Sequence, residues 1–244
     1  TDGVVNTVYV FPNHLAKTAR YIAEASSHEA GHAFGLRHQS TYVDGSKTEE
    51  YNSGSGDWAP IMGSSYYKTR TTWHDGNSYS SSAFQDDMAI ISRTANGFGY
   101  RTDDHGDFNS ATTLNFVADT ATASGIVERM TDQDAFAFTA NAGLLELEVN
   151  VAEVGANLDA VIELWTAGGQ LVATANPSGS YGASISTNVD AGDYVLVVRS
   201  TGEYGSVGQY TVSASRAATV TQVDISGPSS AAEDNVYQFN MEEV

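Results

Sequence analysis

The pattern of apolar and polar residues divides the chain into two regions with different periodicities. Apolar residues recur at helical spacing from about residue 14 to 35, which predicts one long helix, and the β-branched and aromatic residues 4–11 predict a strand before it. A second amphipathic helix is predicted over residues 82–93. From about residue 114 to 215, short alternating runs separated by Gly, Asn or Asp predict an antiparallel β-sandwich.

These patterns place a domain boundary at the polar segment between the two regions. We predict a first domain over residues 1–101, a linker over 102–113, a β-sandwich over 114–215 and a C-terminal linker or tail over 216–244. The charge is divided unequally at the same place. Of the net charge of −19, the first 101 residues carry eight Lys/Arg against ten Asp/Glu, and the remainder carries three against twenty. This acidity argues against nucleic-acid and anionic-membrane partners.

The strongest chemical signal is the string HEAGHAFGLRH, which runs from His28 to His38. Residues four apart lie on one face of a helix, so His28 and His32 can bind one metal ion. Gly35 can adopt backbone angles that let the chain leave the helix and bring His38 back as a third ligand. Three protein ligands leave a position for water, which is typical of a catalytic zinc site. Glu29 is placed to act as general base on that water.

The string matches the extended zinc signature HExxHxxGxxH, and the chain therefore resembles the metzincin metallopeptidases. That family has a methionine turn downstream, and the segment APIMG around Met62 resembles it. The resemblance implies that Met62 forms an apolar floor beneath the zinc without being a ligand. It also implies an α+β catalytic domain with further strands upstream, so we interpret residues 1–101 as the C-terminal part of such a domain.

Two further side chains are secondary candidates for the zinc site. In some metzincins a tyrosine two residues after the methionine approaches the metal; this chain has Ser64 there, and Tyr66 follows two residues later. His74 is chemically able to bind a metal or to steady an oxyanion, although three ligands are already assigned.

The second region resembles the prepeptidase C-terminal domain, a jelly-roll-like module of secreted bacterial peptidases. The resemblance rests on the segments DQDAFAF (Asp132–Phe138), ANLDAVIELWTAGGQLVATA and AGDYVLVV followed by GQYTVS. The region from 114 to 215 contains no histidine. We therefore expect it to serve in binding, stabilisation or export and not in catalysis.

Calcium is a second candidate cofactor, because three groups of acidic residues could supply oxygen ligands. Solvated loop acids are the alternative in each case. The groups are Asp44, Glu49, Glu50 and Asp57 after His38; Asp103, Asp104 and Asp107 around Gly106; and, by the second resemblance, Asp132, Asp134 and Asp159.

The sequence predicts a secreted zinc-dependent endopeptidase that acts on extracellular proteins or peptides. The chain begins with Thr1, and we read it as a processed form or fragment whose signal lay upstream. No apolar run approaches the ~20 residues that span a bilayer. Two alternatives remain: a secreted binding or adhesion protein with a structural zinc site, and a zinc hydrolase that acts on a non-peptide bond. The absence of cysteine excludes disulfides and thiol chemistry but does not decide the compartment. The oligomeric state is not predicted.

Overall fold

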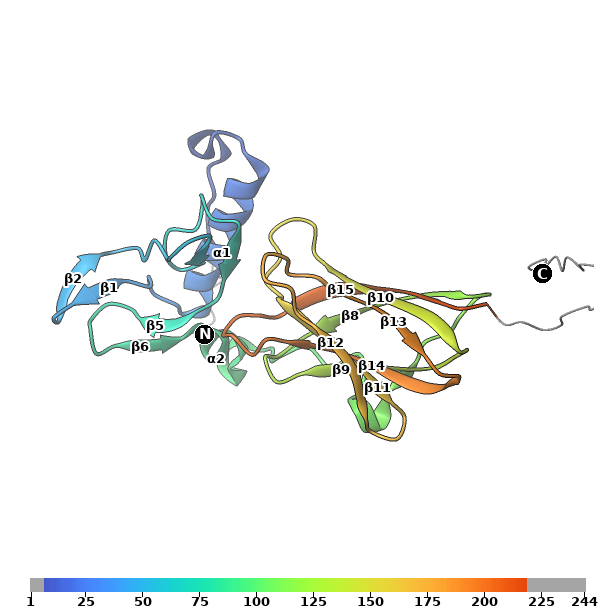
Figure 1. Cartoon of the computed structure of the whole chain (residues 1–244). Helices are drawn as coiled ribbons and strands as arrows, with labels where there is room; N and C mark the ends of the chain where they lie inside the picture. The colour runs from blue at the N-terminus through green and yellow to red at the C-terminus, as the bar shows by residue number, and fades with distance from the viewer. Residues whose placement is uncertain (1–6, 219–244) are drawn as a thin grey trace, which may run out of the picture.

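The computed structural model describes residues 7–218, which form an N-terminal part (residues 7–101) and a β-sandwich (residues 112–216) beside it (Figure 1). The N-terminal part contains one long helix, a short second helix and three pairs of short strands. Its elements are η1 (Pro12–Leu15), α1 (Ala19–Phe34), β1 (Thr41–Val43), β2 (Ser46–Glu49), β3 (Trp58–Pro60), β4 (Arg70–Thr72), β5 (Asp75–Asn77), β6 (Phe84–Asp86), α2 (Asp87–Ser92) and η2 (Thr94–Asn96).

The first helix is shorter than the sequence pattern predicts. It begins at Ala19, because Ala16 and Lys17 have positive φ angles of 51° and 55°, which lie outside the helical region. It ends before Gly35, whose φ of 103° turns the chain away while its N–H donates to carbonyls one turn earlier. The predicted start near residue 14 is therefore wrong.

A strand is predicted over residues 4–11, but residues 7–11, the part of this segment that the structure describes, do not form one. Residues 1–6 lie outside the described residues, and residues 7–11 are extended without pairing. A strand needs a neighbour for its backbone hydrogen bonds, and no segment between residues 7 and 218 supplies one here. Tyr9 and Phe11 are consequently exposed.

The second helix also starts later than predicted. Residues 84–86 form β6, which pairs with β5 in antiparallel fashion, and this pairing delays the helix until Asp87. Asp86 is the N-cap, and its side chain accepts a hydrogen bond from Ala89 N at 2.8 Å. The helix therefore occupies only the second half of the predicted segment.

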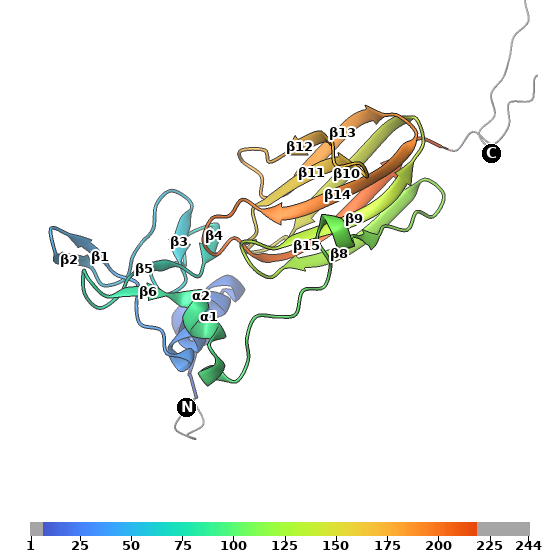
Figure 2. The same cartoon turned by 90° about the horizontal axis from the view of Figure 1, so that it is seen from below.

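The predicted antiparallel β-sandwich is confirmed (Figure 2). One sheet has the strand order β13-β10-β15-β8 and the other β12-β11-β14-β9-β7. All pairings are antiparallel except the short β7, which runs parallel to β9. The strands are β7 (Thr112–Thr113), β8 (Thr120–Val127), β9 (Gln133–Ala140), β10 (Gly143–Val151), β11 (Ala160–Thr166), β12 (Leu171–Ala175), β13 (Ala183–Val189), β14 (Gly192–Ser200) and β15 (Gly208–Arg216).

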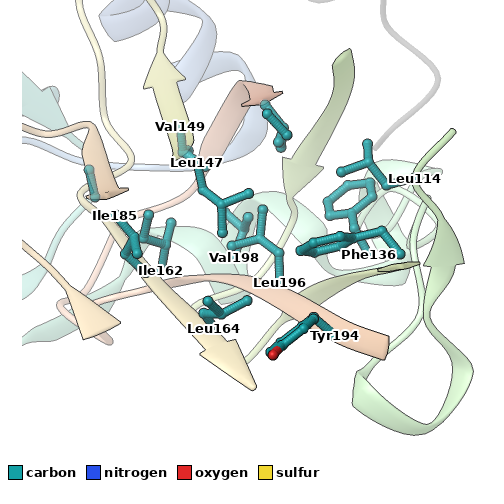
Figure 3. Packing of buried hydrophobic residues seen from close by; sticks show 14 of the residues in the cluster. Leu114, Phe136, Leu147, Val149, Ile162, Leu164, Ile185, Tyr194, Leu196 and Val198 are labelled. Carbon is teal, nitrogen blue, oxygen red and sulfur yellow. The ribbon is translucent and has the colours of Figure 1, made fainter. Parts of the chain in front are cut away.

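The core of the sandwich lies between the two sheets (Figure 3). On β10, Leu145, Leu147 and Val149 are almost fully buried while the residues between them are exposed, as alternation requires. The strand β14 is buried on both faces, because Phe108 and Trp165 pack on its outer side. Phe108 begins η3 (Phe108–Ser110), which lies in the segment for which a linker is predicted.

The two parts of the protein are joined by direct side-chain contacts. The Arg70 guanidinium, in β4, donates to Asn157 O at 2.9 Å and to Glu203 Oε2 at 2.9 Å, and both acceptors lie in loops of the sandwich. Arg70 is buried. None of the described helices is long and apolar enough to cross a membrane.

Candidate functional site

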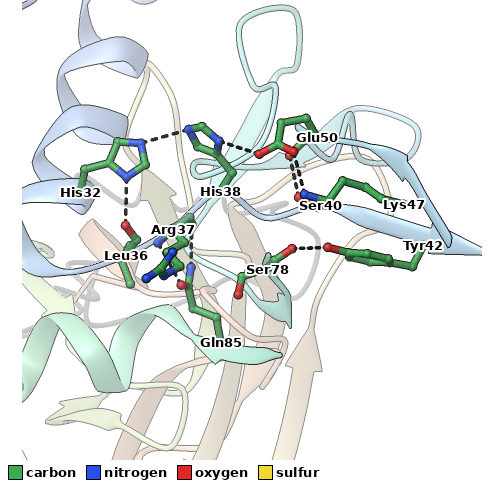
Figure 4. A network of polar contacts seen from close by, with 10 residues as sticks. All are labelled: His32, Leu36, Arg37, His38, Ser40, Tyr42, Lys47, Glu50, Ser78 and Gln85. Carbon is green, nitrogen blue, oxygen red and sulfur yellow. Dashed lines mark hydrogen bonds and ion pairs between the residues drawn. The ribbon is translucent and has the colours of Figure 1, made fainter. Parts of the chain in front are cut away.

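The structure brings His28, His32 and His38 together at the C-terminal end of α1. One ring nitrogen of each lies within 4.8 Å of the others, and His32 Nε2 is 3.1 Å from His38 Nε2. Figure 4 shows these last two rings facing one another. Two nitrogens that bind one tetrahedral zinc at ~2.0–2.1 Å lie about 3.3 Å apart. The observed separation is close to this value.

Each histidine is held through its Nδ1 atom by an acceptor. The acceptors are a carbonyl or a carboxylate, so each Nδ1 carries the hydrogen and each Nε2 has its lone pair free. Burial lowers the pKa of His28, which favours the neutral ring that binds metals. The three contacts are His28 Nδ1 to Ile61 O at 2.7 Å, His32 Nδ1 to Leu36 O at 2.9 Å, and His38 Nδ1 to Glu50 Oε1 at 3.2 Å.

Glu50 therefore contacts a histidine, and within residues 7–218 neither it nor the other loop acids Asp44, Glu49 and Asp57 belong to a group of metal-binding acids. Its carboxylate also accepts from Lys47 Nζ at 2.7 Å (Figure 4). The hydrogen bond from Lys47, followed by that from His38, lowers the pKa of Glu50. Glu50 is thus an ionised partner that orients the third histidine.

Met62 lies directly beneath the helix that carries two of the histidines. It is fully buried, and a Cβ atom added to Gly31 would lie 2.5 Å from the Met62 sulfur. Only glycine therefore permits this approach. Met62 O accepts from Gln39 N at 2.8 Å, next to His38. The methionine segment consequently contacts both chain segments that supply histidines.

Two tyrosines lie beside the histidines. The Tyr51 ring packs on the His38 ring with 4.3 Å between centroids, a contact that no local sequence pattern predicts. Tyr66 packs against Tyr21, and burial, followed by the charges of Glu29 and Glu24, raises its pKa. The Glu29 carboxylate is therefore close enough to Tyr66 for its charge to act on the phenol group.

His74 is separate from the three histidines and is not part of their cluster. Its ring packs on Trp58 with centroids 5.0 Å apart, and its Nδ1 is 3.8 Å from Asp75 Oδ1. Burial lowers the pKa of His74, so the ring is mainly neutral at pH 7. This environment is that of a packed histidine.

A second cluster consists of five carboxylates at the junction of the two parts. Asp103 lies near Glu128 and Asp132 in one group and near Asp104 and Asp134 in another, with oxygens within 4.8 Å in each. Asp103 and Asp104 of the predicted linker group thus meet Asp132 and Asp134 of the predicted sandwich group. Glu128 was not predicted, because it precedes the turn that carries the recognisable acids.

Glu128 and Asp134 are buried without full compensation. Both Glu128 oxygens and Asp134 Oδ1 lack hydrogen-bond partners, and the Arg101 Nε is 3.5 Å from one Glu128 oxygen. Asp134 Oδ2 accepts from Tyr210 at 2.6 Å. Burial, and then neighbouring acids, raise the pKa of Glu128 to about 7, and burial raises that of Asp134 to about 7. An unpaired, buried carboxylate oxygen suits a cation.

Two other predicted acids have local roles outside this cluster. Asp107 Oδ1 accepts from Asn109 N at 3.0 Å and from Ser110 Oγ at 2.9 Å, which caps η3. Asp159 Oδ1 accepts from Asn176 Nδ2 at 3.0 Å.

No protein-family model and no curated protein matches the chain. Among solved structures, the chain is similar to a periplasmic inhibitor of g-type lysozyme from Aeromonas hydrophila, with 14% identity, a TM-score of 0.35, and coverage of 43% of this chain and 94% of that one. It is also similar to the pre-peptidase C-terminal domain of collagenase from Bacillus anthracis, with 19% identity, a TM-score of 0.34, and coverage of 47% and 97%. At these values neither likeness carries a functional argument.

Proposed function

We propose that the protein is a secreted, zinc-dependent endopeptidase whose metal site is formed by His28, His32 and His38 in a metzincin-like α+β domain. The observation that carries the proposal is that all three rings converge while each Nδ1 is held by an acceptor. Partners of this kind orient the rings of metal-bound histidines. Nitrogen donors of this type suit zinc.

Glu29 is the general base in this proposal. Zinc held by the three histidines would supply a water with a pKa of ~7 and would polarise a substrate carbonyl. Glu29 follows His28 on α1, is half-buried, and lies within electrostatic range of Tyr66. Its carboxylate accepts a proton from the attacking water and passes it to the leaving amine. Met62 supports the helix from below and takes no part in proton transfer.

The experiment that tests this proposal replaces Glu29 by Gln in the full chain. We expect Glu29→Gln to lower peptide cleavage by at least ~100-fold, since general-base catalysis typically contributes 10²–10⁴-fold. Zinc content should not change, because Glu29 is not a ligand. Cleavage of a casein or gelatin substrate, together with metal analysis, provides the measurement.

The matched control is Glu148→Gln, because Glu148 is exposed on the sandwich. It should cleave as the wild type does. Unchanged cleavage by Glu29→Gln would refute the assigned base. A wild type that binds zinc but cleaves no peptide would instead favour a binding protein with a structural zinc site, and cleavage of esters alone would favour a non-peptide hydrolase.

The carboxylate cluster supports calcium as a second cofactor, because Asp134 Oδ1 is fully buried without a partner. Asp103 and Asp104 come from the segment that leaves the N-terminal part, whereas Glu128 and Asp134 belong to the sandwich. A cation held by both sets would fix the segment against the sandwich. Its role would be structural.

A further inference from the structure

The loop between β14 and β15 of the sandwich reaches the N-terminal part beside α2 (Figure 1). The Tyr204 hydroxyl donates to Asp86 Oδ1 at 2.5 Å and accepts from Met88 N at 2.8 Å. Gly205 follows with a φ of 79°, and a Cβ atom there would lie 2.5 Å from Trp73 O. The loop is therefore closely fitted, and Tyr204 completes the N-terminal cap of α2 together with Asp86.

The capped end of α2 carries a buried carboxylate with three donors. Asp87 is fully buried, and it accepts from His74 N at 3.0 Å, Gln39 Nε2 at 3.2 Å and Gln85 Nε2 at 2.9 Å. Asp87 and Gln85 flank Asp86 in the chain. Movement of the cap would therefore disturb both side chains.

These side chains hold the backbone on both sides of His38. Gln85 Oε1 accepts from Arg37 N at 2.9 Å, and Gln85 Nε2 donates to Arg37 O at 2.8 Å (Figure 4). On the other side, the fully buried Gln39 is held through Asp87. The segment Arg37–Gln39 has no regular secondary structure, so these side-chain contacts, together with the backbone hydrogen bonds of Gln39 to Met62 and Asn52, determine where His38 lies.

We infer that Tyr204 of the β-sandwich is a positioning residue for His38, acting through the cap of α2 and the side chains of Gln85 and Asp87. This inference rests on the proposed metal site. Under it the sandwich is a structural part of the zinc centre, and the centre reaches its full affinity only when the β14–β15 loop is docked. No residue of the sandwich needs to touch the metal.

The test measures cobalt affinity in the full chain, because Co²⁺ can occupy zinc sites and has a visible spectrum. Tyr204→Phe keeps the ring and removes both hydrogen bonds. We expect Co²⁺ to bind about tenfold more weakly by chelator competition, which is the lower end of the range for partners that orient metal ligands. Circular dichroism and thermal unfolding establish that the variant is folded.

Glu203→Gln is the matched control, because it weakens the contact to Arg70 in the same loop and leaves the cap of α2 intact. It should bind Co²⁺ with wild-type affinity. Asp86→Asn keeps an oxygen acceptor and should also bind nearly as the wild type does. If Tyr204→Phe does not fold, Asp86→Ala removes the same hydrogen bond from the other side and is predicted to give the same tenfold loss.

Wild-type affinity in Tyr204→Phe or in Asp86→Ala would overturn the inference and leave the proposed function intact. An equal loss in Glu203→Gln would also overturn it, because the effect would then come from general loosening of the interface. Failure of the wild type to bind Co²⁺ or Zn²⁺ would instead refute the proposed function.

Discussion

The N-terminal part and the sandwich differ in the residues that they bury, and therefore in the interactions that stabilise each of them. Among the described residues, the N-terminal part buries ten polar or charged residues and six apolar ones, whereas the sandwich buries four and twenty-seven. The apolar sandwich core stabilises its fold without directional contacts. The N-terminal part depends on specific hydrogen bonds, which each contribute only ~0.5–1.5 kcal/mol net. The contacts that Arg70 and Tyr204 make across the boundary add to these bonds, and under the proposed function a bound metal would add to them as well.

The largest effect on stability is expected from a cavity in the sandwich core. Leu147 is 1% exposed, so Leu147→Ala should lower the free energy of unfolding by ~2–5 kcal/mol. The control is Leu144→Ala on the same strand, where the side chain is 48% exposed. Urea unfolding of both variants measures the difference. Equal losses in the two would contradict the account of β10 as a strand with one buried face.

Calcium and pH test the buried carboxylates of the sandwich, which resemble the buried polar groups of the N-terminal part. The pKa values of Glu128 and Asp134 are raised to about 7. A raised carboxyl pKa means that stability is full below the unfolded pKa of ~4 and is lost as the pH rises through about 7. Without calcium, the melting temperature should therefore fall between pH 4 and pH 8.

Added calcium should reverse this loss at pH 8 and have little effect at pH 4, where Glu128 and Asp134 are protonated. A change of ~1 kcal/mol corresponds to about 4–8 °C in a domain of the size of the sandwich. The double variant Glu128→Gln with Asp134→Asn is the control. Its melting temperature should depend neither on pH in this range nor on calcium. A melting temperature that is independent of both pH and calcium would show that the cluster binds no ion.

Local patterns were enough to predict the sandwich, because alternation along each strand directly records which face is buried. The helix start at Ala19 could not be predicted, since the positive φ angles of Ala16 and Lys17 carry no glycine signal. The parallel pairing of β7 with β9 could not be predicted either. The strand β7 has only two residues, which are too few to show the alternation of buried and exposed side chains.

The three histidines could be predicted to converge, because their spacing on one helix and across Gly35 is local. The contacts that hold these histidines in place could not be predicted. Ile61 O and His28 are 33 positions apart in the chain, and the Tyr204 hydroxyl reaches Asp86 across 118. Glu50 resembled any solvated loop acid until the fold placed it on His38. Contacts of this range depend on the fold as a whole.

The most direct test of the central claim is the zinc content of the purified chain, measured by native mass spectrometry after equilibration with one equivalent of zinc. The account predicts one bound zinc in the wild type and in His74→Ala, and loss of that zinc in His32→Ala. Retention of zinc by His32→Ala, or its loss in His74→Ala, would contradict a centre formed by His28, His32 and His38.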